Sequence, residues 1–131
     1  MTKFQTVMPR VMVTEITRTA NFYCESLGFT VDVLWPEKSP VFCILSRNHV
    51  RLGFYIADEH RPNARIGSAE FHIDVQGVTE LHDQLKPKMS VEWGPEVFFY
   101  GRREFAVKDP DGYLVIFSEQ TTDPPTCPDQ A

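Results

Sequence analysis

The sequence predicts an α+β fold made of two βαβββ modules. The first observation is a strand, turn, strand pattern over residues 101–119. Its turn, Asp109-Pro110-Asp111-Gly112, joins a proline, which pre-sets the backbone angle, to a glycine, which tolerates positive φ. The second observation is that the order strand, helix, three strands occurs twice along the 131 residues. The third is an offset of 62 residues between the copies, which relates Val13 to Val75.

The first module is expected to span residues 4–60. Its helix is predicted because apolar residues recur at three- and four-residue spacings between Glu15 and Leu27, and Gly28 is placed to end it. Pro9 favours an edge position for the strand that precedes the helix. Apolar alternation predicts four strands, at residues 5–13, 29–34, 41–46 and 50–57, before a polar loop over 58–67.

The second module is expected to span residues 68–119. Its predicted elements are strands at 69–75, 91–100, 103–108 and 113–118 and a helix at 77–85. Alternation in the last strand places Val115 and Phe117 beneath the helix, whereas Leu114, Ile116 and Ser118 face the open side of the sheet. Each module therefore has one face covered by its helix and one open, concave face.

Composition limits the classes of partner. A net charge of −5 disfavours nucleic acid and is compatible either with a cationic small ligand or with solubility alone. Three cysteines, Cys24, Cys43 and Cys127, have no metal-ligand spacing and are expected to be reduced thiols. No apolar run has the length of a signal peptide core or a membrane span, so we expect a cytoplasmic protein. Residues 120–131 are polar and rich in proline, which predicts a mobile tail.

Two segments resemble a known family. They are the opening strand and helix, Val13-Thr14-Glu15-Ile16 through Asn21-Phe22-Tyr23 to Leu27-Gly28-Phe29, and the closing Arg103-Glu104-Phe105-Ala106-Val107-Lys108-Asp109-Pro110-Asp111-Gly112-Tyr113. Over residues 4–119 the chain resembles the vicinal oxygen chelate superfamily of glyoxalase I, extradiol dioxygenases, and fosfomycin and bleomycin resistance proteins. The resemblance implies a single domain over residues 1–131, in which the paired modules form a cupped mixed sheet. It also implies a homodimer with ligand sites in the cups, but no particular reaction.

Enzymes of this superfamily hold a divalent metal on the inward faces of the first and last strands of each module. The resemblance puts those positions at Met8, near Phe54, at Glu70 and at Ile116, and the offset of 62 relates the same positions in pairs. Only Glu70 has a side chain that binds a hard divalent ion, so no cofactor is expected. His72 lies on the same strand face as Glu70, which leaves open a relocated metal site at these two residues and, with it, a metal-dependent lyase or dioxygenase.

Aromatic side chains, in place of metal ligands, are predicted to line the cup. The bleomycin resistance proteins that the chain resembles are acidic, metal-free homodimers that hold a cationic drug with an aromatic tail. We therefore predict metal-independent binding and sequestration of a bleomycin-like antibiotic or another aromatic or cationic ligand. The predicted ligand-binding residues are Arg10, Trp35, Phe42, Phe54, Glu70, His72, Trp93, Tyr100 and Ile116. A structural or regulatory dimer whose cup is filled by its own side chains is the third hypothesis.

The remaining functional expectations concern charge and nucleophiles. No Ser, His, Asp arrangement or GxSxG motif is visible, so no catalytic residue is predicted. Arg10 is expected to pair with Glu70, because a buried unpaired charge is costly. Arg102, Arg103 and Glu104 are expected to form a solvated or interface network, in which individual ion pairs contribute little.

Overall fold

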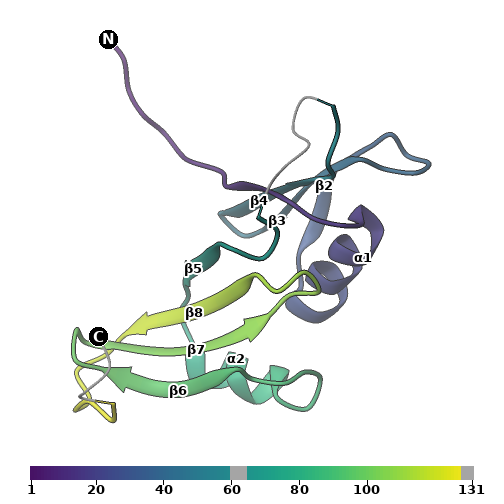
Figure 1. Cartoon of the computed structure of the whole chain (residues 1–131). Coiled ribbons are helices and arrows are strands. Elements are labelled where there is room, and N and C mark those ends of the chain that lie inside the picture. The colour runs from purple at the N-terminus through teal and green to yellow at the C-terminus, as the bar shows by residue number, and fades with distance from the viewer. Residues whose placement is uncertain (60–64, 128–131) are drawn as a thin grey trace. The chain divides into compact units, whose positions relative to one another are not determined.

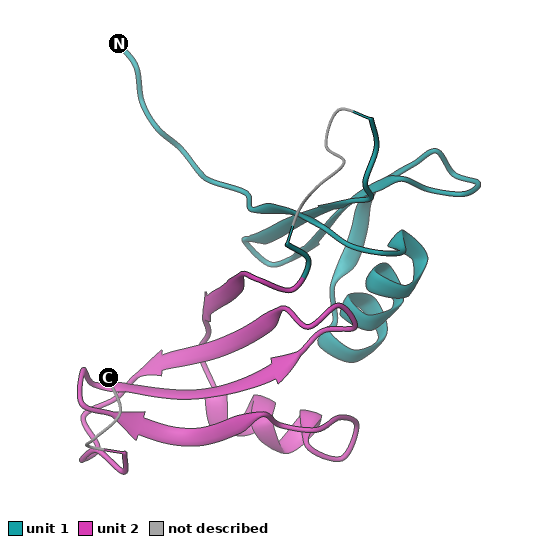
Figure 2. Ribbon diagram, viewed as in Figure 1, with its two compact units in different colours: residues 1–66 teal, residues 67–131 magenta. Residues whose placement is uncertain are grey.

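A computed structural model describes residues 1–59 and 65–127 of the chain. The chain divides into two compact units, residues 1–66 (unit 1) and 67–131 (unit 2), coloured separately in Figure 2. Each unit contains a four-stranded mixed sheet and one helical region, which confirms the predicted α+β class and the repeated βαβββ order. The predicted cup concerns the placement of the two sheets relative to each other and stays a prediction.

Unit 1 begins with a strand that is shorter than predicted. Its elements are β1 (Arg10–Met12), α1 (Ile16–Asn21), the π-helical segment η1 (Phe22–Ser26), β2 (Thr30–Trp35), β3 (Phe42–Arg47) and β4 (Val50–Tyr55), labelled in part in Figure 1. The sheet order is β1-β4-β3-β2, with β1 parallel to β4 and the other pairs antiparallel. Pro9 directly precedes β1, and its lack of an N–H agrees with a short edge strand.

The helical region of unit 1 covers one face of its sheet. Ile16, Ala20 and Tyr23 are buried, as their helical spacing predicts. The Tyr23 ring lies 5.1 Å from the Phe54 ring of β4 and 5.5 Å from the Phe29 ring, measured between centroids. Gly28, with φ of 73°, follows the helical region, as expected for a glycine that ends a helix.

Unit 2 repeats this plan. Its elements are β5 (Glu70–Asp74), α2 (Val78–Leu85), β6 (Trp93–Phe98), β7 (Arg102–Lys108) and β8 (Leu114–Gln120). The sheet order is β5-β8-β7-β6, with β5 parallel to β8. The turn between β7 and β8 is the predicted one, because the Asp109 carboxylate accepts hydrogen bonds from the backbone N–H groups of Asp111 and Tyr113 and Gly112 has φ of 89°.

Alternation along the strands of unit 2 separates a covered from an open face. Val115 and Phe117 of β8 are buried on the side of α2, where the Phe117 ring contacts Phe105 of β7 at 5.1 Å. The register pairs Ile116 with His72 of β5, whose side of the sheet is open. The predicted position of Val115 and Phe117 beneath the helix is therefore confirmed, and the concavity in front of Leu114, Ile116 and Ser118 stays a prediction.

The offset between the two copies of the repeat differs between their first and last strands. Arg10 pairs with Gly53 in unit 1 and His72 pairs with Ile116 in unit 2, so the offset is 62 for the first strands but 63 for the last. Four residues separate the paired Ser46 and Arg51, whereas five separate the paired Lys108 and Leu114. The longer turn shifts β8 by one residue, and a shift of one residue exchanges the two faces of a strand.

The chain after β8 packs along the edge of unit 2. Thr126 donates its backbone N–H to the Val97 carbonyl at 2.8 Å, and its Oγ1 accepts from the Val97 N–H at 2.8 Å. Arg103 also forms an ion pair with Asp123. Thr126 thus satisfies the backbone groups of Val97 in the edge strand β6. This ordered segment differs from the mobile tail that the sequence predicts from residue 120 onward. Residues 128–131 of that tail, like residues 60–64 of the predicted loop, lie outside the described residues.

The carboxylate of Glu119 caps α2 from the neighbouring strand. It accepts hydrogen bonds from the backbone N–H groups of Gly77 at 2.9 Å and Val78 at 3.0 Å. These two bonds hold the pKa of the Glu119 carboxyl below its ordinary value. Glu119 therefore fastens the start of α2 to the end of β8.

Replacing Glu119 by alanine should lower the free energy of unfolding by about 1 kcal/mol at neutral pH, the usual contribution of a helix N-cap. Because the pKa of folded Glu119 is depressed, its contribution is complete above the carboxyl pKa of the unfolded chain, about 4.3, and is lost as the pH falls through the lower folded value. Urea denaturation at neutral pH and in mild acid measures both effects. Gln120→Ala, at the next residue of β8, is the control, and equal stability of the two variants at neutral pH would contradict the capping role.

Candidate functional site

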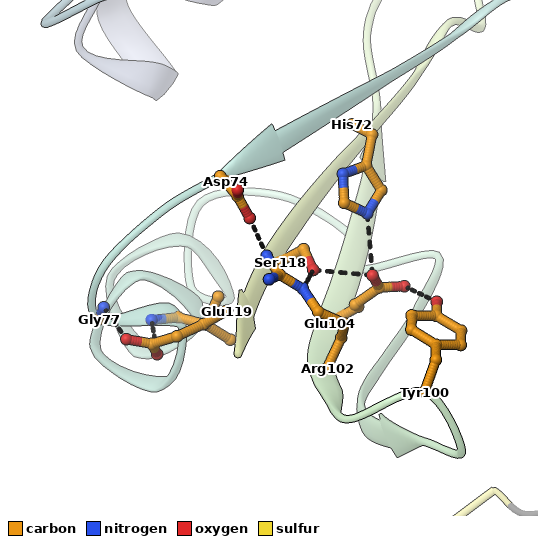
Figure 3. A network of polar contacts seen from close by, with 9 residues as sticks. His72, Asp74, Gly77, Tyr100, Arg102, Glu104, Ser118 and Glu119 are labelled. Carbon is orange, nitrogen blue, oxygen red and sulfur yellow. Dashed lines mark hydrogen bonds and ion pairs between the residues drawn. The ribbon is translucent and has the colours of Figure 1, made fainter. Parts of the chain in front are cut away.

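The open face of unit 2 gathers polar side chains around one buried carboxylate. Glu104 of β7 is only 3% exposed and lies beside Ser118 of β8 in the register. Its Oε1 accepts a hydrogen bond from the Tyr100 hydroxyl at 2.7 Å. Its Oε2 accepts from the Ser118 hydroxyl at 2.8 Å and lies 2.9 Å from Nε2 of His72 (Figure 3). We call these four residues, Tyr100, His72, Ser118 and Glu104, the Glu104 network.

The donors keep Glu104 ionised. Burial opposes ionisation and raises the pKa of this carboxyl, but the hydrogen bonds from Tyr100, His72 and Ser118 outweigh burial and lower it. Partial burial, the hydrogen bond to Glu104 and the negative charge of Glu104 raise the pKa of Tyr100 to about 12. Tyr100 therefore remains a donor at neutral pH, and both oxygens of Glu104 are occupied by protein groups.

His72 connects this network to the open face. Its side chain is 52% exposed although Nε2 faces the buried carboxylate. A carboxylate at that distance selects the tautomer with a proton on Nε2, which leaves Nδ1 as an acceptor in the neutral ring. The arrangement orients the imidazole and leaves Nδ1 outside the bond to Glu104.

A second polar pair lies next to the Glu104 network. Arg102 donates through Nε to the Ser118 hydroxyl at 2.8 Å and forms an ion pair with Asp74 of β5 (Figure 3). A shallow polar depression of about 490 Å³ borders this pair and is lined by Asp74, Val75, Gln76, Arg102, Glu119 and Gln120. Of the two expected environments for Arg102, Arg103 and Glu104, the solvated one is wrong for Glu104, because Glu104 is buried. A role of these three residues at an interface stays a prediction.

Three aromatic rings adjoin the network. Tyr100 stacks on Phe98 with centroids 5.8 Å apart and an interplanar angle of 10°. Phe98 in turn contacts Trp93 edge to face at 5.8 Å. Trp93 and Phe98 belong to β6 and pair with open-face positions of β7. The predicted ligand residues Trp93 and Tyr100 therefore lie close together, joined by Phe98.

The other predicted residues of unit 2 also lie on its open face. Glu70 of β5 is exposed and pairs with Leu114, while Ile116 pairs with both His72 and Ala106. Among the residues that the structure describes, no group of three or more His, Cys, Asp or Glu side chains is placed to hold a metal ion. In that same part of the chain, no helix is long and apolar enough to cross a membrane.

Three predicted residues of unit 1 lie on the open face of its sheet. The guanidinium carbon of Arg10 lies 4.7 Å from the centroid of the Phe42 ring, and Trp35 pairs with Phe42 in the register. Phe54 does not join them, because it is fully buried on the covered face against Tyr23. The expected equivalence of Phe54 with Ile116 fails by one residue, and Gly53 takes that position. The predicted pair of Arg10 with Glu70 would join the two units and stays a prediction.

Two cysteines, the buried Cys43 and the partly exposed Cys24, do not have the features of reactive thiols. Cys43 is buried in β3, and burial raises the pKa of its thiol to about 12. Burial also raises the pKa of Cys24. Such thiols are poor nucleophiles, because the thiolate is the reactive form.

Sequence reasoning missed the central residue of the site. Glu104 was grouped with its charged neighbours Arg102 and Arg103, although Phe105 next to it is an apolar strand residue. Alternation from Phe105 places Glu104 on the open face. The alternation of the strand therefore indicates the face on which Glu104 lies. The run of charged residues around Glu104 favours exposure to solvent instead.

Comparisons with known proteins agree on one family. The family model described as "Glyoxalase superfamily protein" matches residues 1–123. A bleomycin resistance protein from Geobacillus stearothermophilus is 28% identical over 135 residues, which cover 86% of this chain and 95% of that protein. A bleomycin resistance protein from Staphylococcus aureus (strain MRSA252) matches with the same values.

Solved structures share the fold. One is a bleomycin-binding protein from bleomycin-producing Streptomyces verticillus, in complex with copper(II)-bleomycin, with a TM-score of 0.70 and 22% identity; the match covers 94% of this chain and all of that one (100%). Another is the virulence protein STM3117 from Salmonella typhimurium, with a TM-score of 0.69 and 20% identity over 92% of this chain and 100% of that one. At sequence identities this low, the structural matches establish a common fold and nothing more.

Replacing Glu104 by alanine should lower the free energy of unfolding by about 1–3 kcal/mol, because the buried Ser118 hydroxyl loses its acceptor. Glu70→Ala is the matched control, since Glu70 is an exposed glutamate on the same sheet face, and its effect should stay within about 0.5 kcal/mol. Chemical denaturation of both variants measures the difference. A Glu104→Ala protein as stable as Glu70→Ala would show that the Glu104 network does not hold the face together.

Proposed function

We propose that this chain, which belongs to the glyoxalase superfamily, binds and sequesters an antibiotic of the bleomycin type. The observation that carries the proposal is the stacked pair Phe98 and Tyr100, whose hydroxyl is fixed by the buried Glu104 carboxylate. Flat rings held in place offer stacking surfaces to a planar group at little entropic cost. The likeness to bleomycin resistance proteins over nearly their full length supports this choice of ligand.

Charge supports a ligand that carries cationic groups. The chain has a net charge of −5, and the open face of unit 2 bears the exposed carboxylate of Glu70 beside the Glu104 network, whereas Asp74 is paired with Arg102. Acidic groups around an aromatic surface attract cations and favour their stacking on rings. The proposed contacts in unit 2 are therefore Trp93, Tyr100 and Ile116 for planar groups, and Glu70 and His72 for polar ones.

We also propose that the protein supplies no metal of its own and acts as a cytoplasmic homodimer. The proposed contacts to the ligand are side chains of the open faces, so binding does not require a metal ion that is coordinated by the protein. The family resemblance supports the dimer, and three free cysteines agree with a reducing compartment. Sedimentation velocity of the purified chain tests the dimer directly.

Titration with bleomycin should change the tryptophan emission in a saturable manner, because Trp93 lies next to the proposed stacking surface. His72→Ala should weaken binding about tenfold, which corresponds to the loss of about 1.4 kcal/mol from one well-placed polar contact. His82→Ala is the matched control, because His82 lies in α2 and contacts Phe105 on the covered face. Calorimetry should give the same order of affinities. An unchanged emission and no heat of binding with the wild type would reject this ligand.

Removal of metal from the protein should leave binding unchanged. The protein is dialysed against EDTA, analysed for residual zinc, nickel, manganese and iron, and titrated with metal-free bleomycin and with copper(II)-bleomycin. Equal affinities before and after dialysis are expected for each form of the drug. A loss of binding that is restored by one divalent metal, and abolished in Glu70→Ala, would instead favour the alternative of a metal-dependent lyase or dioxygenase.

A further inference from the structure

Arg10 lies across the open sheet face of unit 1. It begins in β1 next to Gly53 of β4, and a Cβ atom at residue 53 would stand 2.8 Å from Cγ of Arg10. The absence of a side chain at Gly53 therefore makes room for the arginine stem. From there the guanidinium reaches the ring of Phe42 on the next strand, β3, with 4.7 Å between the guanidinium carbon and the ring centroid.

In unit 2, a side chain of the first strand also extends across the open face, but its chemical groups are different. His72 and Glu104 stand 62 residues after Arg10 and Phe42, and the His72 side chain reaches from β5 across β8 to Glu104 on β7. Unit 2 thus has an imidazole fixed by a carboxylate where unit 1 has a guanidinium fixed by a ring. In both units the first strand presents a nitrogen-bearing group over the middle of the open face.

The guanidinium keeps its hydrogen-bonding capacity. The guanidinium lies over the Phe42 ring. Its N–H groups lie in the guanidinium plane and match the two oxygens of a carboxylate. Within the described residues of unit 1, 1–59 and 65–66, no carboxylate forms an ion pair with Arg10. In an acidic chain, a positive charge that is held over a ring without an acidic partner in its own unit is an attractive point for an anion.

Aromatic rings continue beside the guanidinium. Tyr55, Phe42 and Trp35 are direct neighbours across β4, β3 and β2, so their side chains share the open face. The Trp35 residue is 65% exposed. Neighbouring strands lie about 4.8 Å apart, so a ring stacked on Trp35 places a carboxylate substituent within reach of a guanidinium over Phe42.

We propose that this face, through Arg10, Phe42 and Trp35, binds a planar aromatic carboxylate. Arg10 pairs with the carboxylate through two N–H groups, and Trp35 stacks on the aromatic ring. Gly53 is a positioning residue, because it lets the arginine stem lie flat. The site is chemically distinct from the acidic face of unit 2 and does not depend on bleomycin being the ligand of the protein.

The probe pair is 2-naphthoate and its neutral analogue 2-naphthamide. The indole N–H signals of Trp35 and Trp93 are assigned in ¹H–¹⁵N spectra with Trp35→Phe and Trp93→Phe. In the wild type, 2-naphthoate should shift the Trp35 signal in a saturable manner, with an affinity at least about tenfold higher than that of 2-naphthamide, the equivalent of one charged contact. Trp93 reports separately on unit 2, so failure here and failure of the bleomycin proposal are distinguishable.

Variants test each element of the site. Arg10→Met should remove the preference for the carboxylate, and Arg10→Lys should retain part of it, because lysine keeps the charge but not the planar fork. Gly53→Val should weaken binding although the charge is unchanged, and a Trp35 signal that keeps its ligand-free position shows that unit 1 of the variant is folded. Equal affinity for the two probes, or an unchanged preference in Arg10→Met, would overturn the proposal. So would a Trp35 signal that moves with protein concentration alone, which would assign this face to a second copy of the chain.

Discussion

The structure of unit 2 depends on the burial of one ionised carboxylate. Glu104 would be costly in the interior without donors, and Tyr100, His72 and Ser118 provide them from three different parts of the unit. Each donor is in turn held in a single orientation, so the ring of Tyr100 can stack on Phe98 and the imidazole of His72 can face outward. Stability and the shape of the open face therefore have the same physical origin.

The two units show how one scaffold carries two chemistries. In each, the helix buries one sheet face, and the strand order places the first strand beside the last. The open faces of the two units carry different side chains. Unit 2 has a buried acid with its donors, and unit 1 has a cation on an aromatic row. The repeat conserves backbone geometry, while side chains at equivalent positions differ in charge.

Patterns of alternation predicted the order of elements and the two faces of β8, because a buried and an open face impose a period of two on the sequence. They failed where a single residue changed the register. The turn before β8 is one residue longer than the turn before β4, so Phe54 lies in the core and Gly53 occupies the open position. Glu104 was missed for another reason: its partners are distant in sequence, and only the folded sheet brings them together. The π-helical segment after α1 also left no recognisable mark in the helical spacing.

The segment that follows β8 lies along the outer edge of the sheet of unit 2. Thr126 occupies the backbone groups of Val97 in β6, which would otherwise be unpaired at the sheet margin. A polypeptide shortened to residue 120 would present that margin to other molecules, and exposed margins of this kind recruit further strands. A segment with few apolar residues thus covers part of the sheet margin through hydrogen bonds to the backbone.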